Sequence, residues 1–261
     1  MQRAGTSIRL NHVSKSFSIG RKTVAAVDAV DLTIEAGEFV SFIGPSGCGK
    51  STILRMVAAL EAPTAGQVTI GDLPPSEMAQ HHRLGVAFQD HALLPWLTVR
   101  KNVELPFRIA SRPVNDQQID QLLNLVGLSE FDRARPKQLS GGMRQRASIA
   151  RALILQPDVL LLDEPFGALD QVTRRHLNIE LQNIWARNAI TTILITHSVD
   201  EALFLSDRVV VLSGRPGRVV KVLPVPFGRP RSPSVMRDPL FHQLADDLTE
   251  SLEGYVGSEE P

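Results

Sequence analysis

The sequence has very little cysteine and tyrosine. Cys48 is the single cysteine, and only one tyrosine occurs among 261 residues. A disulfide within one chain is therefore impossible, and a reducing compartment suits the protein. Apolar residues make up 43% of the chain, enough for a sizeable core in one large domain or two small ones.

The formal net charge of the chain is zero. The 28 Lys and Arg residues are balanced by 28 Asp and Glu residues. The basic run GRPRSP at 228–233 is too short to change this balance. We therefore expect no nucleic-acid partner.

Long apolar runs are missing as well. No window approaches the ~18 to 20 apolar residues that cross a bilayer. The N-terminal stretch MQRAGTSIRLNHV lacks the apolar centre of a secretion signal. We expect the protein to act at a membrane only from its side.

Short apolar strands alternate with helical stretches, which indicates an α/β layered fold. The stretch 38–44 predicts a buried strand that enters a glycine turn, and 51–60 predicts a helix. The runs at 158–165 and 190–197 are continuously apolar, as in strands covered on both faces. Helical patterns dominate 98–155, and 207–223 predicts a hairpin.

The segment GPSGCGKST at 44–52 fits the spacing of a phosphate-binding loop. Gly44, Gly49, Lys50 and Ser51 occupy the defining positions, between a predicted strand and a predicted helix. Backbone N–H groups of such a loop converge on one point. Lys50 can reach the β- and γ-phosphates, and the Ser51 hydroxyl can bind Mg²⁺. A glycine-rich turn that matches by chance is the alternative, and the strand–helix context disfavours it.

Polar residues at the ends of other predicted strands complete this picture. Asp163 closes the run VLLLD and suits a second Mg²⁺ ligand. Glu164 can align and polarise an attacking water. Gln89 can contact the metal or the water, and His197 the γ-phosphate. Phe17 can stack on adenine. Each could alone be an ordinary strand end or core residue, so only the combination points to a nucleotide site.

The segment LSGGMRQR at 139–146 predicts a second anion site. Ser140, Gly141 and Gly142 open a helical pattern, and small residues there leave backbone N–H groups pointing outward. The chain thus has two predicted phosphate sites.

These motifs, with GALD at 167–170 and TH at 196–197 in the same order, make the chain resemble the ATP-binding subunit of an ABC transporter. The resemblance runs from about Ile8 to about Val222. It implies a P-loop NTPase fold with a mainly parallel core sheet, an antiparallel β subdomain and an inserted helical subdomain at about 98–155. The ATP-binding domain would cover 1–228, and 229–261 would be a C-terminal tail with a short helix.

The resemblance implies ATP and Mg²⁺ as cofactors and assigns residues to each. The catalytic residues are Glu164, His197 and Gln89. The metal ligands are Ser51, Gln89 and Asp163. The cofactor-binding residues are Phe17, Gly44, Pro45, Ser46, Gly47, Cys48, Gly49, Lys50, Ser51, Thr52, Ser140, Gly141, Gly142 and Asp170.

The resemblance also explains the second anion site. In such proteins two copies meet head to tail, and each ATP lies between the phosphate loop of one copy and the LSGG segment of the other. One chain then has two half-sites and needs a second copy of itself, or a close relative in a pseudo-dimer. Two positions depart from the wider family: Met143 stands where Gln is more frequent, and Phe17 where Tyr is frequent.

A finer resemblance is to the nitrate, sulfonate and taurine importers. It rests on HALLPWLTVRKNVELP at 91–106, LSGGMRQR and LSGRPGRVV at 212–220. It implies a separate membrane permease, contacted near Leu93, Leu94, Pro95 and Trp96, and indirectly a substrate-binding protein. Core packing is the alternative for Trp96. The expected location is the cytoplasmic face of the bacterial inner membrane, as a peripheral subunit.

Two other functions remain as alternatives. A soluble ABC ATPase that acts on ribosomes or DNA tends to have two ATP-binding domains or a long coiled coil, which this sequence lacks. A non-catalytic nucleotide switch has no need of a water-aligning carboxylate such as Glu164. The sequence leaves the cargo open among sulfonate, taurine, nitrate and pyrimidine-like compounds. In the tail, the spacing of Leu240, Leu244, Leu248 and Leu252 predicts a helix docked on the same domain.

Overall fold

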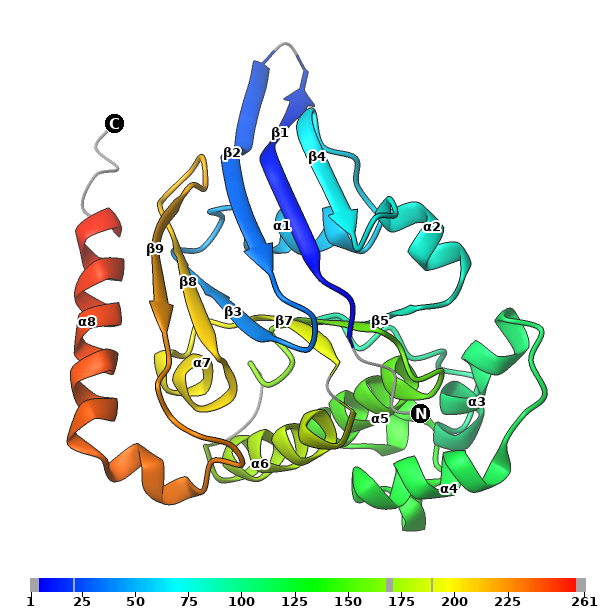
Figure 1. Cartoon of the computed structure of the whole chain (residues 1–261). Helices are drawn as coiled ribbons and strands as arrows, with labels where there is room; N and C mark the ends of the chain where they lie inside the picture. Colours follow the sequence, from blue (N-terminus) through cyan, green and yellow to red (C-terminus); the bar gives the residue numbers. More distant parts are fainter. Residues whose placement is uncertain (1–4, 21, 168–170, 189, 257–261) are drawn as a thin grey trace.

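Two β-sheets form the frame of the protein, and the computed structural model describes them within residues 5–20, 22–167, 171–188 and 190–256. The smaller sheet is antiparallel, in the order β2–β1–β4 (Figure 1). Its strands are β1 (Ile8–Ile19), β2 (Lys22–Ile34) and β4 (Ala65–Ile70). Alternating buried and exposed residues at the start of β1 give this sheet one face on the core.

The larger sheet has six strands in the order β5–β6–β7–β3–β8–β9. They are β3 (Phe39–Ile43), β5 (Leu84–Ala87), β6 (Val159–Asp163), β7 (Thr191–Ile195), β8 (Arg208–Leu212) and β9 (Val219–Pro224). Neighbours are parallel except at β8 and β9, which form an antiparallel hairpin. Because parallel strands end at one edge, the segments that follow β3, β5, β6 and β7 meet there.

Helix α1 (Lys50–Val57) lies between the two sheets (Figure 1). Its residues Ile53, Leu54, Met56 and Val57 are buried in a core that contains side chains from both sheets. The short helix α2 (Pro75–Gln80) connects β4 to β5. This packing fixes the start of α1 at the end of β3.

The opposite face of the larger sheet is covered by α5 (Gly141–Leu153), α6 (Gln171–Asn188) and α7 (Val199–Leu205) (Figure 1). Helix α5 also packs with α3 (Val99–Ile109) and α4 (Asp116–Leu125) around a separate apolar cluster. Two short 3₁₀ helices, η1 (Ser129–Phe131) and η2 (Pro136–Gln138), link α4 to α5. The helical stretch expected at 98–155 therefore contains three α-helices and two short 3₁₀ helices, with a core of its own.

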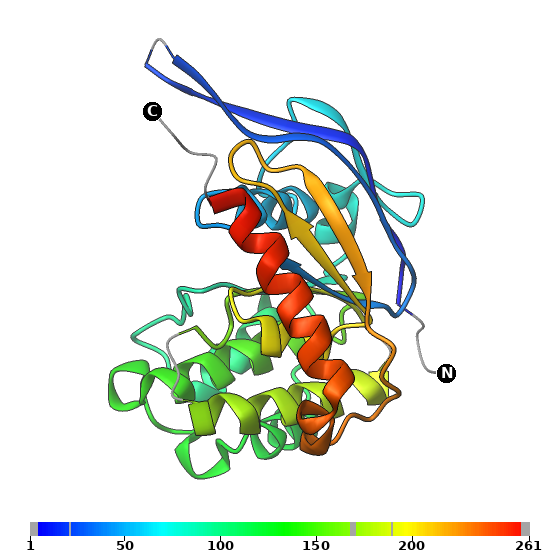
Figure 2. The same cartoon turned by 90° about the vertical axis from the view of Figure 1, so that its left-hand side faces the viewer.

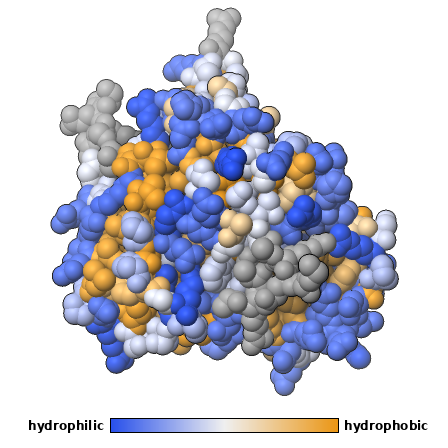
Figure 3. Space-filling model, in the orientation of Figure 1, coloured by the Kyte–Doolittle hydropathy of each residue, from blue (hydrophilic) through white to orange (hydrophobic). Residues whose placement is uncertain are grey.

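The tail folds back on the domain through η3 (Pro233–Arg237) and α8 (Pro239–Val256). Figure 2 shows α8 lying across the side that carries β8, β9 and α7, and apolar residues gather on that side in Figure 3. The buried face of α8 includes Phe241 and Leu248, whereas Leu240 is 39% exposed. The predicted leucine stripe was thus wrong at Leu240, because buried positions at i, i+3 and i+4 begin at Phe241.

The α/β fold with a mainly parallel core sheet, a separate antiparallel sheet and a helical insertion is confirmed. The helix expected at 51–60 is shorter, since α1 ends at Val57 and Ala59 adopts a φ of 61°. None of the helices in the described ranges combines the length and apolarity needed to cross a bilayer.

Candidate nucleotide site

The loop between β3 and α1 is shaped by glycine. Gly49 has a φ of 98° and is the N-cap of α1. A β-carbon at Gly49 would lie 2.6 Å from the carbonyl oxygen of Ala26, so no other residue fits. The loop therefore turns tightly over β2 and delivers the chain directly into α1.

The start of α1 has no acceptor of its own. Gly49 offers no side-chain cap, and no acidic residue occurs in the first turn. Lys50 is 8% exposed, and its Nζ donates to the carbonyl oxygens of Gly44 and Pro45, each at 2.8 Å. Bare N–H groups and an adjacent ammonium form a strong attraction for phosphate.

A hydroxyl–carboxylate pair joins this loop to β6, which is separated from β3 by β7 in the sheet. Ser51 Oγ donates to Asp163 Oδ1 at 3.0 Å, and Asp163 ends β6 with 7% exposure. Burial raises the pKa of the Asp163 carboxyl above its ordinary value, and the hydrogen bond from Ser51 partly offsets this rise. The pair offers two hard oxygen ligands at the mouth of the loop.

Glu164 lies where three strands end. Its backbone is left-handed, with a φ of 45°, and its N–H donates to the Ile195 carbonyl of β7 at 2.9 Å. Its Oε2 accepts from Gln89 Nε2 at 3.2 Å and lies 3.6 Å from His197 Nδ1. A non-glycine residue held in this conformation is costly and is typical of functional sites. The strand ends of β5, β6 and β7 thus bring Gln89, Glu164 and His197 together.

This cluster is open to solvent on one side. The side chain of Glu164 is 25% exposed and that of His197 is 57% exposed. Water can therefore reach a carboxylate that already has two polar neighbours, and such a carboxylate can orient water and accept its proton.

The LSGG segment forms a second exposed helix start. Ser140 is the N-cap of α5, and its hydroxyl accepts from the Met143 N–H at 3.3 Å. Arg144 donates to the Leu139 carbonyl at 2.8 Å. Figures 1 and 2 place α1 and α5 on opposite faces of the larger sheet. The structure does not unite the two predicted phosphate sites within one chain.

The remaining predicted residues are placed as follows. Phe17 is half-buried in β1 against the core, with Lys15 Nζ 5.0 Å from its ring centre. Cys48 is buried beneath the loop, whereas Ser46 and Gly47 are exposed. Asp170 lies outside the described residues.

The interpretation of the sequence missed two features near the site. A β-carbon at Gly217 would lie 2.0 Å from the Cys48 carbonyl oxygen, so the β8–β9 turn presses directly on the loop. Glu201 is buried behind His197 and bonds to the Thr196 hydroxyl. The pattern Ser198-x-x-Glu201 is the signal that could have marked this helix start, since the Ser198 hydroxyl accepts from the Glu201 N–H at 3.3 Å.

The glycine loop, its lysine and the acidic strand end define a P-loop nucleotide hydrolase. A family model described as "ABC transporter" matches residues 27–167. The chain belongs to the ABC transporter family, and within it is an ATP-binding ATPase.

Named relatives cover almost the whole chain. The nitrate import ATP-binding protein NrtD of Synechococcus elongatus is 45% identical over 92% of this chain and 89% of its own. The aliphatic sulfonates import ATP-binding protein SsuB of Bacillus cereus is 42% identical over 87% and 89%. A dimeric structure of the ATP-binding cassette MJ0796 bound to ADP and Pi has a TM-score of 0.77, with 32% identity over 85% of this chain and 100% of that one.

Proposed function

We propose that the protein is the ATP-hydrolysing subunit that energises import of a small anionic or zwitterionic nutrient, of the sulfonate, taurine or nitrate type, through a separate membrane permease. The observation that carries the proposal is the contact of Glu164 with Gln89 and His197 beside the phosphate loop. The names of the relatives support import of nitrate or sulfonate.

The Ser51–Asp163 pair fits Mg²⁺. This ion prefers oxygen ligands and usually takes one or two from the protein and the rest from water and phosphate. Within the described ranges, no group of three or more His, Cys, Asp or Glu side chains could hold a metal. Gln89, the third proposed ligand, bonds to Glu164 here. When bound, Mg²⁺ would neutralise charge on the β- and γ-phosphates.

Each of the proposed site residues then has a separate role in binding or hydrolysing ATP. Lys50 exchanges its two carbonyl partners for phosphate oxygens, and the bare N–H groups of α1 bind the same phosphates. Glu164 accepts the proton of the attacking water as the bond to the γ-phosphorus forms and the bridge to ADP breaks. His197 and Gln89 hold the water and the γ-phosphate in line. Phe17 stacks on the adenine ring.

A second copy completes each site. Ser140, Gly141 and Gly142 of one copy meet the γ-phosphate held by Lys50 of the other. The separation of α1 and α5 within one chain supports this arrangement, as does the dimeric form of the MJ0796 cassette. The copies would therefore close on two nucleotides and reopen after hydrolysis.

The permease contact is proposed at the segment after Gln89. Trp96 is 66% exposed and Leu93 and Leu94 are half-buried, so core packing does not account for Trp96. Nearby, β5, α3 and α5 line a groove of about 320 Å³ whose walls include Leu105 and Ile109. Ile109 is 65% exposed. An apolar element of a permease would cover these side chains.

We place the subunit on the cytoplasmic face of the membrane, with 1–228 as the ATP-binding domain and 229–261 as the tail.

Phosphate release by the purified wild-type protein and by the Glu164→Gln variant tests the hydrolysis. Co-purification with the permease encoded nearby tests the coupling. A wild-type protein as inactive as the variant, or one that never retains a permease, would contradict the proposal.

A further inference from the structure

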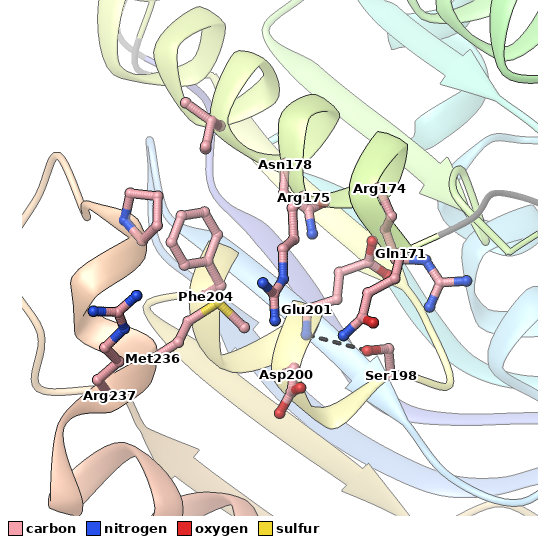
Figure 4. A pocket seen from close by; sticks show the side chains of 12 residues that line it. Gln171, Arg174, Arg175, Asn178, Ser198, Asp200, Glu201, Phe204, Met236 and Arg237 are labelled. Atoms are coloured by element: carbon pink, nitrogen blue, oxygen red, sulfur yellow. Dashed lines mark hydrogen bonds between the residues drawn. The ribbon is translucent and has the colours of Figure 1, made fainter.

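A cavity apart from the phosphate loop lies where the tail meets the domain. It has a volume of about 270 Å³ and is lined by α6, α7, the residue before α7 and η3 (Figure 4). We call it the tail pocket. None of the phosphate-loop residues lines it.

The walls of the tail pocket are firmly held. Arg231 donates to the carbonyl oxygens of Leu203 and Ser206 at 2.9 and 2.7 Å, at the end of α7. Gln182 of α6 accepts from the Arg231 N–H at 2.8 Å and donates to its carbonyl at 2.7 Å. The tail wall is thus fixed to both helices, and the cavity is preformed as ligand sites usually are.

The pocket carries an excess of positive charge. Three arginines line it, Arg174 and Arg175 from α6 and Arg237 from η3. Within the described part of the chain, neither Arg175 nor Arg237 lies within ion-pair distance of a carboxylate. Two acidic residues face these arginines: Asp200 is exposed, and burial raises the pKa of Glu201 to about 7. Near neutral pH the cavity therefore attracts anions.

One wall of the pocket is apolar. Phe204 is 3% exposed and belongs to the core, and Ile179 and Met236 pack against that core. Figure 4 shows Phe204 and Met236 on the side of the cavity toward η3. A bare inorganic ion would leave this wall in contact with water, whereas an anion with a short hydrocarbon part would cover it.

A buried polar group also faces the cavity. Asn178 is 6% exposed, and its Oδ1 has no hydrogen-bond partner among the described residues. Because a buried acceptor without a donor is costly and an anion has no proton to donate, this oxygen calls for a water molecule beside the ligand.

We propose that the tail pocket binds a small organic anion of the short-chain sulfonate or carboxylate class. Its charged end meets Arg175 and Arg237, and its apolar end packs on Phe204 and Met236. The ligand joins η3 to α6 and α7 and thereby changes the rate of ATP hydrolysis.

The route to the nucleotide site is short. The Ser198 N–H donates to the Thr196 hydroxyl at 3.0 Å, and that hydroxyl also bonds to Glu201. A small hollow beside Glu164 and His197 shares Arg174, Ser198 and Glu201 with the tail pocket. A ligand packed on Phe204 restrains α7, which begins after Ser198 and contains Glu201, and thereby restrains His197, the residue between Thr196 and Ser198.

Calorimetric titration of the full chain with butane-1-sulfonate tests the binding. Butyrate, inorganic sulfate and n-butanol are titrated in parallel. We expect both organic anions to bind and sulfate and butanol to bind at least about tenfold more weakly, since each lacks one of the two contacts. Equal binding of sulfate, or no binding of either organic anion, would overturn the proposal.

Matched variants locate the site. Arg175→Gln with Arg237→Gln should weaken butane-1-sulfonate binding about tenfold or more. Arg112→Gln with Arg133→Gln removes the same charge from exposed positions and should leave binding unchanged. Equal weakening in both pairs would show a general charge effect and contradict the assignment.

The effect on hydrolysis rests on the proposed function, but the binding does not. Phosphate release is measured across the butane-1-sulfonate titration, and the change should follow the calorimetric curve and vanish in the Arg175/Arg237 pair. A wild-type protein that binds the anion but hydrolyses no ATP contradicts the proposed function and leaves the pocket standing. Hydrolysis that continues unchanged at saturating anion contradicts the coupling.

Discussion

The helices α1 and α5 both begin at a predicted phosphate site, yet the two starts are built differently. At α1, Gly49 provides no cap and Lys50 lies over the loop. At α5, the Ser140 hydroxyl already accepts from the Met143 N–H. A helix start attracts an anion most strongly when its N–H groups are unsatisfied and a cation is close. The α1 site should therefore bind nucleotide alone, and the α5 site only a nucleotide that another copy already holds.

Removing Lys50 should abolish the stronger site. Lys50→Ala deletes the ammonium that donates to Gly44 and Pro45 and would donate to phosphate. We expect ATP affinity to fall about 10- to 100-fold and hydrolysis to be lost, by fluorescent-nucleotide titration and phosphate release. Lys22→Ala, a charge-matched change at an exposed strand position, should behave as wild type. Near-normal turnover by a folded Lys50→Ala protein would exclude the phosphate-loop assignment.

Replacing Glu164 should separate binding from hydrolysis. Glu164→Gln keeps the size of the side chain but cannot accept a proton, and a general base contributes about 10²- to 10⁴-fold in rate. We expect hydrolysis to fall by that factor while ATP remains bound. Removal of the negative charge also favours a closed dimer.

Sizing chromatography gives the second readout for this variant. Glu164→Gln should elute as a monomer without nucleotide and as a dimer with ATP, whereas wild type dimerises only transiently. A variant that stays monomeric in ATP, or that hydrolyses at the wild-type rate, would show that Glu164 is not the catalytic carboxylate.

Blocking the weaker site should spare binding and stop turnover. Ser140→Arg places a long side chain at the exposed start of α5, where a partner's γ-phosphate would lie. We expect one chain to bind ATP normally through Lys50, while hydrolysis falls about 10²-fold because the closing contacts to the phosphate are lost. Loss of ATP binding by the monomeric variant would argue against two half-sites.

Low pH should weaken Mg²⁺-dependent ATP binding, and only at the α1 site. Burial raises the pKa of Asp163, and a metal ligand must be ionised, so protons compete with Mg²⁺ at a higher pH than for an ordinary Asp. The Mg²⁺-dependent part of ATP affinity is thus complete at high pH and declines as pH falls, by up to about tenfold per unit below that pKa. ATP titrations at pH 5 to 8, with Mg²⁺ or EDTA, measure this. Asp163→Asn should show no such decline beyond the EDTA control.

The α1 site was predictable because its determinants are local. A buried apolar run, the glycine spacing and Lys50 occur within a dozen residues, and the structure places them as a strand, a loop and a helix. The end of α1 was less predictable. Ala59 adopts a φ of 61°, and nothing in its side chain signals a left-handed turn.

Features that depend on distant segments could not be derived from the sequence. Glu201 is only 4% exposed because α6 packs over α7, and no clear apolar stripe marks α6 in the sequence. The contact of Gly217 with the phosphate loop depends on a hairpin about 170 residues later in the chain. The meeting of Gln89, Glu164 and His197 was predicted only as three strand ends; the order β5–β6–β7 makes it a cluster.

The smallest expected effect concerns the side-chain cap that distinguishes the start of α5 from the start of α1. Ser140→Ala removes the cap of α5 and leaves the Met143 N–H unsatisfied, as the N–H groups of α1 are. Loss of such a cap costs about 1 kcal/mol, so the urea concentration at the midpoint of unfolding should fall slightly. Because the proposed closed dimer places the Ser140 hydroxyl at the partner's γ-phosphate, we expect hydrolysis, corrected for folded protein, to fall several-fold while the monomer still binds ATP. Unchanged hydrolysis would show that the hydroxyl serves only the helix and that a freed N–H binds the partner's phosphate instead. Ser129→Ala, an exposed serine at the start of η1 without a side-chain cap, is the matched control and should change neither quantity. Only a fall in hydrolysis without a fall in monomer binding would give Ser140 a direct role in the weaker half-site.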